Sequence, residues 1–112
     1  MSHSPTVLEE LARVIHSRRE ADPSRSYTAQ LLEGGVDRIA DKVLEEAREL
    51  VEAARTSNGE SGRAAVTHEA ADLLYHTLVL LESRGVVLDT LLAELERRFG
   101  QSGLAEKESR GG

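Results

Sequence analysis

The sequence predicts an all-α fold, a small bundle of four to five helices built on an antiparallel helical hairpin. Apolar residues recur at helical spacing in most of the chain, which favours helices that bury one face. Clusters of Gly, Ser, Asn and Pro separate these periodic segments, as turn residues do between helices. The length of 112 residues limits the chain to one compact domain, residues 1–112.

The composition narrows the function classes. A chain with no Cys has neither a disulfide scaffold nor a thiolate metal site, which fits a reducing cytoplasm. A formal net charge of −6 argues against nonspecific binding to nucleic acid, which needs a basic surface. The longest apolar run, residues 77–81, is far too short to span a membrane, and the N-terminus has no signal-peptide pattern. We therefore expect a cytoplasmic protein that binds neither nucleic acid nor a membrane.

The N-terminal segment predicts a helix that ends near Arg19. Ser4-Pro5-Thr6 followed by Glu9 has the pattern of a capping box, in which a hydroxyl and a carboxylate satisfy the first free amides. The apolar positions that follow recur at helical spacing: Val7, Leu8, Leu11, Val14 and Ile15. Asp22-Pro23-Ser24 then breaks the helix and begins a loop. His16 is interpreted as an ordinary surface residue.

Two further helices are expected in the middle of the chain. Ser26-Tyr27-Thr28 opens a short helix that runs through Glu33, with the Ser or the Thr as its cap. Gly34-Gly35 ends that helix, because two adjacent glycines permit a sharp bend. A long helix then runs from Val36 to about Arg55, since its apolar residues mark one face.

The second half of the chain completes the predicted hairpin. Residues 57–62 are expected to form a loop whose length suits two antiparallel helices. A second long helix follows from Ala64 to Arg84, with Gly85 as its left-handed cap. Asp89 is predicted to cap a last helix that extends through Phe99. Residues 100–112 have little to bury and are expected to form a flexible tail.

Two acidic pairs are the main functional signal. Glu46 and Glu49 lie three residues apart in the first long helix, and so do Glu69 and Asp72 in the second. Residues i and i+3 share a helix face, so antiparallel packing brings the four carboxylates, the acidic cluster, together. Four anions at one place need a cation. Oxygen ligands without Cys or His favour a hard ion, Mg²⁺ first and Mn²⁺ second.

The surroundings of the second pair support the metal interpretation. Residues 64–81 are apolar around nearly the whole helix, and one polar stripe contains Ala65, Glu69, Asp72 and His76. Acids on a helix that is otherwise buried must be paired or bind metal. The alternative is a set of ion pairs with Arg side chains of a neighbouring helix.

Two more polar residues lie near the first acidic pair. Lys42 lies with Glu46 and Glu49 along one border of the apolar face of the first long helix. A Lys among carboxylates is usually an ion-pair partner, although beside a metal it could also hold a phosphate. Glu45 lies further toward the polar side of the helix, where it is either solvated or a neighbour of the ligands.

The sequence resembles the phosphoribosyl-ATP pyrophosphatase family, part of the all-α NTP pyrophosphatase (MazG-like) group. The resemblance spans most of the chain and lies in these segments: Ser26-Tyr27-Thr28, Gly34, residues 42–47, Glu49, residues 69–76, Ser102-Gly103 and Glu106-Lys107. The acidic cluster fills the signature of the group, a Glu-x-x-Glu followed by a Glu-x-x-Asp. That signature gives only the superfamily, whereas the other segments point to the narrower family. Leu44 departs from the pattern, because many members have Gly there.

The resemblance implies Mg²⁺-dependent hydrolysis of phosphoribosyl-ATP to phosphoribosyl-AMP and pyrophosphate, in histidine biosynthesis, by a cytoplasmic homodimer. Cleavage of a phosphoanhydride needs neutralised phosphate charge and a positioned water, and carboxylate-held Mg²⁺ supplies both. Glu45 or Glu46 is the candidate that takes the proton from the water. Lys42 is a candidate phosphate contact, and His76 is a candidate base or a partner that orients Asp72.

A substrate with a ribose phosphate on its adenine ring needs a second anion site. The candidates lie at the start of the short helix and in the tail: Ser26, Tyr27, Thr28, Ser102, Lys107 and Arg110. On the alternative interpretation these residues are an ordinary helix cap and a disordered end. Two other functions stay open, a housecleaning nucleoside-triphosphate pyrophosphatase of the same fold and a non-catalytic helical dimer that acts as an interaction protein.

The prediction of a homodimer also rests on the helix itself. Residues 64–81 carry more apolar surface than three short helices of one chain can cover. Four of them are candidate interface residues, although some could face the core of their own protomer: Val66, Leu74, Leu78 and Leu81.

Overall fold

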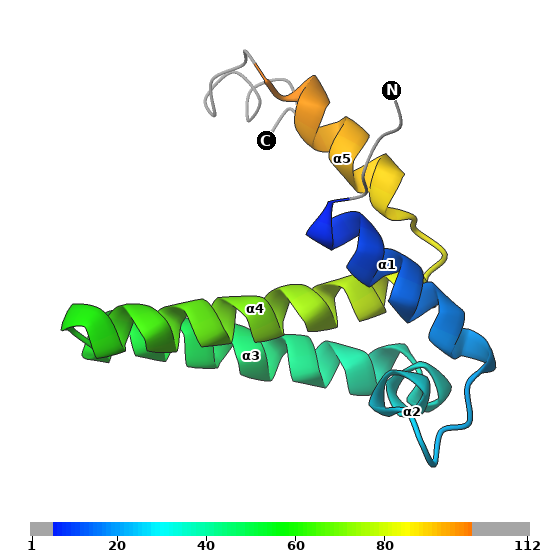
Figure 1. The fold of residues 1–112 in the computed structure, drawn as a ribbon, viewed down its shortest axis with the longest axis horizontal. Coiled ribbons are helices and arrows are strands. Elements are labelled where there is room, and N and C mark those ends of the chain that lie inside the picture. The colour runs from blue at the N-terminus through cyan, green and yellow to red at the C-terminus, as the bar shows by residue number, and fades with distance from the viewer. Residues whose placement is uncertain (1–5, 100–112) are drawn as a thin grey trace.

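The structure is a computed structural model that describes residues 6–99, and this part of the chain is helical with no strand (Figure 1). Its elements in chain order are α1 (Val7–Ser17), the 3₁₀ turn η1 (Arg18–Glu20), α2 (Tyr27–Gly34), α3 (Val36–Thr56), α4 (Gly59–Ser83) and α5 (Leu88–Arg97). The all-α prediction is therefore confirmed. None of the described helices is long and apolar enough to cross a membrane.

The two long helices form the expected antiparallel hairpin and lie side by side along their length (Figure 1). α1 and α2 pack at the end of the hairpin where α4 finishes, and α5 extends away from it (Figure 1). Among residues 6–99, the turn between α3 and α4 therefore projects from the other helices, and the two long helices cover only each other there (Figure 1).

The hydrophobic core lies at the covered end of the hairpin. Its buried residues come from every α-helix: Ile15, Leu31, Ile39, Leu78, Val79 and Leu88. The side chains of Leu81, Leu91 and Leu92 are partly buried against this core. Because the core holds α3 and α4 together at one end, the two helices keep a fixed register further along the hairpin.

The predicted helix ends agree with the structure at three places. Thr6 caps α1 through a capping box with Glu9. The hydroxyl of Ser26 accepts a hydrogen bond from the backbone N–H of Ala29 and so caps α2. Gly85 has φ of 72°, the left-handed conformation expected after α4, and the next amide bonds back to the carbonyl of Leu81.

The predicted six-residue loop is wrong, because only Ser57 and Asn58 lie outside the helices. Gly62, expected to be a loop residue, is buried in the first turns of α4. A Cβ atom at this position would lie 2.7 Å from the backbone carbon of Ser57, so the turn can pass this close only to a glycine. Glu60 in the first turn also favours the helix, since a negative charge there complements the helix dipole.

The start and end of the last helix also differ from the prediction. Asp89 does not cap α5, because the capping residue is Val87 and Asp89 lies inside the first turn. The charge of Asp89 can still interact favourably with the helix dipole. Phe99 lies beyond the end of α5 and is largely exposed, so it does not continue the apolar face of that helix.

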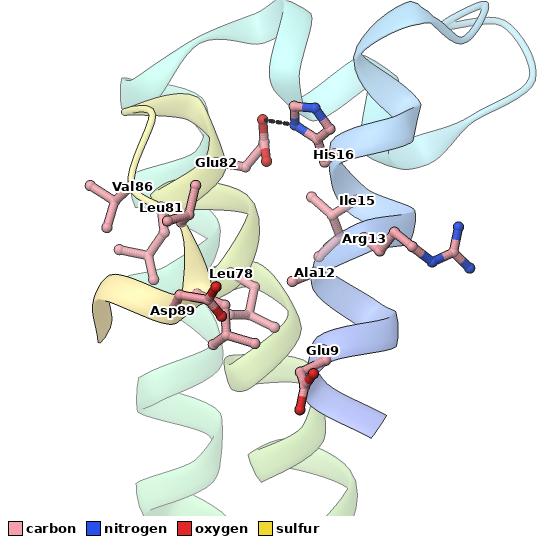
Figure 2. Close-up of a pocket in the computed structure, with 12 residues that line it drawn as sticks. Glu9, Ala12, Arg13, Ile15, His16, Leu78, Leu81, Glu82, Val86 and Asp89 are labelled. Carbon is pink, nitrogen blue, oxygen red and sulfur yellow. Dashed lines mark hydrogen bonds and ion pairs between the residues drawn. The ribbon is translucent and has the colours of Figure 1, made fainter. Parts of the chain in front are cut away.

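Glu82 joins the end of α4 to the N-terminal segment. Its carboxylate accepts hydrogen bonds from the guanidinium of Arg19 and from His16, whose Nδ1 lies 3.0 Å away (Figure 2). Burial raises the pKa of Glu82, but these hydrogen bonds and charges outweigh burial and leave the pKa below its usual value. His16 is therefore an exposed surface residue, as predicted, and it also has a specific partner in Glu82.

Candidate metal centre

The hairpin brings the four residues of the acidic cluster together. Glu46 and Glu49 come from α3, and Glu69 and Asp72 come from α4. One ligand atom from each of Glu46, Glu49 and Glu69 lies within 4.8 Å of the other two, and one from Asp72 lies within 4.8 Å of Glu69. The i and i+3 spacing on two antiparallel helices thus places the four carboxylates in two overlapping groups that share Glu69, and their role as metal ligands stays a prediction.

Glu46 is the most buried member of the acidic cluster. It is 6% exposed, and its Oε2 atom has no hydrogen-bond partner within residues 6–99. Burial raises the pKa of Glu46, and the charges of Glu49 and Asp72 raise it further, against smaller opposing effects of His76 and Lys42. A buried carboxylate oxygen without a donor is unfavourable, so this atom fits a role as a cation ligand.

Glu69 faces Glu46 and Glu49 across the hairpin. Its Oε2 atom is also buried without a hydrogen-bond partner in the described part of the chain. Burial raises the pKa of Glu69, as do a hydrogen bond to Glu49 and the charges of Glu49 and Asp72, while His68 has a lowering effect. Oxygen donors that repel one another suit a hard divalent cation such as Mg²⁺ or Mn²⁺.

His76 lies one helical turn after Asp72 on α4 and is buried. Its Nδ1 donates a hydrogen bond to the backbone carbonyl of Asp72 at 2.8 Å, because a carbonyl can only accept. In neutral His76 the Nε2 atom must then accept the hydrogen bond from the Tyr27 hydroxyl, which lies 3.1 Å away. The chain Tyr27–His76–Asp72 therefore connects the start of α2 to the acidic cluster.

Lys42 and Glu45 form an ion pair beside the acidic cluster. The Nζ atom of Lys42 lies 3.2 Å from a carboxylate oxygen of Glu45. This hydrogen bond raises the pKa of Lys42, and the charges of Glu45 and Glu46 add to the effect, against desolvation. Lys42 thus lies between the start of α2 and the acidic cluster, with its ammonium held by Glu45.

The start of α2 borders a cavity of about 530 Å³. Ser26, Tyr27 and Thr28 line it together with two cationic side chains and one carboxylate, those of Arg18, Arg25 and Asp22. The hydroxyl of Thr28 hydrogen-bonds the hydroxyl of Tyr75, so this residue is partly held from α4. Neither arginine was predicted as a site residue from the sequence, because only the fold of η1 and the following loop brings them to the start of α2.

Three predicted substrate residues, Ser102, Lys107 and Arg110, lie outside the described residues, as does the rest of the predicted tail. His68 was also missed by the sequence analysis. It precedes Glu69 directly and lies one helical turn before Asp72, a spacing at which side chains share a face.

The fold and the site define an all-α protein with a carboxylate cluster between two antiparallel helices. Comparison with known proteins narrows this class. A model of the family described as phosphoribosyl-ATP pyrophosphohydrolase matches residues 8–99. The chain therefore belongs to the phosphoribosyl-ATP pyrophosphohydrolase family, which confirms the family predicted from the sequence.

Relatives of this family align with nearly the whole chain. A phosphoribosyl-ATP pyrophosphatase of Trichlorobacter lovleyi is 47% identical over 98% of this chain and 98% of its own length. One of Erythrobacter litoralis is 51% identical over 93% of this chain and 96% of its own. One of Rhizorhabdus wittichii is 52% identical over 92% of this chain and 93% of its own.

Proposed function

We propose that this protein hydrolyses phosphoribosyl-ATP to phosphoribosyl-AMP and pyrophosphate in the cytoplasm, as a step of histidine biosynthesis. Family membership over residues 8–99 supports the hydrolase activity and its substrate. Relatives that are about half identical over nearly their whole length carry the same activity in their names. The housecleaning and non-catalytic alternatives find no such support.

The observation that supports the mechanism most directly is the unpartnered, buried oxygen of Glu46 within the acidic cluster. Glu46, Glu49, Glu69 and Asp72 would hold Mg²⁺, with Mn²⁺ as a substitute. A divalent cation there supplies neutralisation of the phosphate charge and lowers the barrier to attack by water. Side chains of the protein would position the phosphates and accept the proton of the attacking water.

Lys42 and Glu45 are the proposed pair for that transfer. In the ion pair the ammonium of Lys42 holds the carboxylate of Glu45 at 3.2 Å. When Lys42 turns to a substrate phosphate, Glu45 is released and accepts the proton of the attacking water. Glu46 is less suited to this task, because it is buried and belongs to the ligand set.

The cavity at the start of α2 is the proposed site for the ribose phosphate. Arg18 and Arg25 supply positive charge, and the free amides at the start of α2 supply hydrogen-bond donors. Tyr27 lies between this cavity and the acidic cluster, since it lines the former and bonds His76. Two anion sites on either side of Tyr27 suit a substrate with phosphates at both ends.

A homodimer is proposed to cover the exposed part of the hairpin. Of the four candidate interface residues, Leu78 is only 5% exposed within its own protomer, and Leu81 packs against the same core. These two are therefore core residues. Leu74 is 41% exposed, and Val66 is partly exposed near the projecting end of the hairpin, so both stay candidates for the interface.

Turnover of phosphoribosyl-ATP, compared with ATP, GTP and dUTP at saturating Mg²⁺, tests this function. We expect the unaltered protein to prefer phosphoribosyl-ATP markedly over the three nucleoside triphosphates. The Arg18→Gln and Arg25→Gln variants should lose this preference. Faster turnover of an ordinary nucleoside triphosphate would favour the housecleaning enzyme. No turnover of any of them by the folded protein would favour the non-catalytic dimer.

A further inference from the structure

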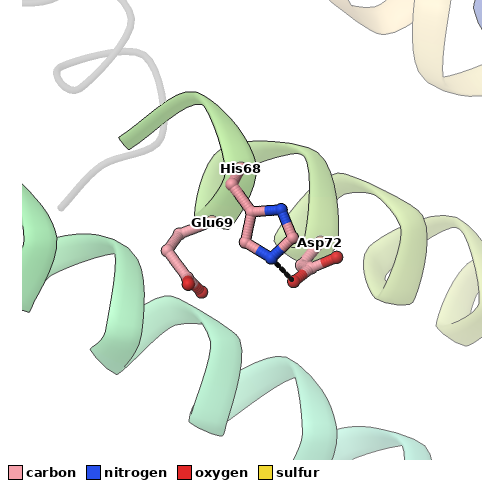
Figure 3. A group of neighbouring side chains, drawn as sticks. All are labelled: His68, Glu69 and Asp72. Carbon is pink, nitrogen blue, oxygen red and sulfur yellow. Dashed lines mark ion pairs between the residues drawn. The ribbon is translucent and has the colours of Figure 1, made fainter. Parts of the chain in front are cut away.

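His68 lies beside the acidic cluster without belonging to the predicted ligand set. Its Nε2 atom lies 3.3 Å from a carboxylate oxygen of Asp72. Figure 3 shows the imidazole of His68 next to Asp72, while Glu69 reaches toward the opposite helix. One ligand atom from each of the three residues lies within 4.8 Å of the other two.

These distances fit ligands of one cation. Two donors at about 2.1 Å from a metal lie about 3.0 to 3.4 Å apart at octahedral or tetrahedral angles. The separation of 3.3 Å between His68 and Asp72 falls in that range. Glu69 is shared, because it also belongs to the group that contains Glu46 and Glu49. A cation contacting His68 would thus share Glu69 and Asp72 with the acidic cluster.

A second observation points to a cation at this place. Glu46, which is nine-tenths buried, groups with Glu49 and Glu69 and so shares Glu69 with the group of His68, and its Oε2 atom has no hydrogen-bond partner within residues 6–99. The buried Oε2 of Glu69 has no hydrogen-bond partner within residues 6–99 either. The ion pair between His68 and Asp72 satisfies neither of these atoms, whereas a cation coordinated from both helices does.

We propose that His68 is a metal ligand of this chain and that it acts with Glu69 and Asp72. This inference rests on the proposed metal centre and adds a nitrogen donor to a set otherwise made of oxygens. Imidazole binds Co²⁺ and Zn²⁺ more readily than Mg²⁺. His68 would therefore give the centre a stronger preference for transition ions over Mg²⁺ than the four carboxylates alone.

Pulsed electron paramagnetic resonance of bound Mn²⁺ tests this directly, because a coordinated imidazole nitrogen gives a ¹⁴N coupling. We expect that coupling in the unaltered protein, in His16→Gln and in His76→Gln, and its loss in His68→Gln. His16→Gln is the matched control, since His16 is an equally exposed histidine that pairs with Glu82 and lies away from the centre. Coupling that persists in His68→Gln, or disappears in His76→Gln instead, overturns the proposal.

Calorimetric titration with Co²⁺ and with Mg²⁺ gives an independent measurement. In His68→Gln we expect Co²⁺ affinity to fall by about tenfold or more, with Mg²⁺ affinity changed much less. Equal affinities for Co²⁺ before and after the substitution overturn the role of His68. If Glu69→Gln abolishes Mn²⁺ binding but the bound Mn²⁺ shows no ¹⁴N coupling, the proposed carboxylate centre stands and only the role of His68 as a ligand is overturned. Absence of any Mn²⁺ binding overturns both.

Discussion

The burial of Glu46 makes its charge a source of instability when no cation is bound. Its folded-state pKa is raised by burial and then by the charges of Glu49 and Asp72, so the folded state binds its proton more tightly than the unfolded state does. Stability therefore decreases as pH rises from the unfolded pKa, about 4.3, through the raised folded pKa. The free energy that ionisation of Glu46 costs is present at neutral pH and absent in acid.

A Glu46→Gln variant should consequently melt at a higher temperature than the unaltered protein at pH 7.5 in a metal-free buffer. The difference should shrink as pH falls toward 4, because Glu46 is then protonated in both states. Saturating Mg²⁺ should raise the melting temperature of the unaltered protein and not that of the variant. Calorimetry in chelator and in Mg²⁺ measures both effects, and a variant that is less stable than the unaltered protein in chelator would contradict this account of Glu46.

The acidic cluster should act as one unit in catalysis. Changing any one of Glu46, Glu49, Glu69 and Asp72 to its amide leaves a cation under-coordinated, so turnover should fall by about 100-fold or more in each variant. The exposed Glu33 on α2 gives a matched control, because Glu33→Gln leaves all four carboxylates in place. Steady-state assays decide this, and near-normal turnover in two of the four amide variants would disprove the assignment.

At the scale of elements, Glu82 is the residue that ties the end of α4 to α1 and η1. Burial raises its pKa, but the hydrogen bonds from Arg19 and His16 prevail and leave the folded pKa below the usual value. A carboxylate with a depressed folded pKa stabilises the protein above its unfolded pKa, and this stabilisation is lost as pH falls through the folded pKa.

We therefore expect Glu82→Gln to lower the free energy of unfolding by about 1 to 2 kcal/mol at pH 7. The difference from the unaltered protein should narrow below about pH 4.5 and vanish in stronger acid. Urea unfolding between pH 3 and pH 7 measures the profile. A difference that stays constant across this range would mean that Glu82 contributes through packing and not through its charge.

The turn between α3 and α4 depends on Gly62. An Ala here gains helix propensity worth about 0.5 to 1 kcal/mol, but its Cβ would lie 2.7 Å from the backbone of Ser57. The close contact should dominate, with a net loss of about 1 to 3 kcal/mol. Ser61→Ala is the control, because Ser61 is the exposed neighbour of Gly62. Chemical denaturation compares the two, and a Gly62→Ala variant as stable as the control would show that the turn can relax.

Some helices and site residues could be predicted from the sequence, whereas others depend on the fold. The presence and order of the helices could be predicted from the helical spacing of apolar residues, because each helix turns one apolar face to the core. The boundary at residues 57–62 could not be predicted in this way, because the sequence does not distinguish a glycine that allows close backbone approach from a glycine in a loop. The acidic cluster was predictable from spacing within two helices. Arg18 and Arg25 were not, because a turn and a loop place them.

At the scale of the whole molecule, the core and the acidic cluster occupy different parts of the hairpin. All α-helices contribute to the core at one end, while the turn end of α3 and α4 has no covering helix among residues 6–99 (Figure 1). The hairpin leaves apolar side chains exposed along its length, among them Val51 near the turn and Leu74 further along α4. Burial of this surface against a second copy would stabilise the hairpin that carries the acidic cluster.

The resulting prediction concerns Leu74. A Leu74→Glu variant places a charge in the proposed interface, so it should sediment as a monomer at micromolar concentrations at which we expect the unaltered protein to be a dimer. Val7→Glu is the control, because Val7 is even more exposed and lies on α1 away from the hairpin turn. The melting temperature of the unaltered protein should rise with protein concentration, and that of the Leu74→Glu variant should not. An unaltered protein that sediments as a fully active monomer at these concentrations would rule out the dimer.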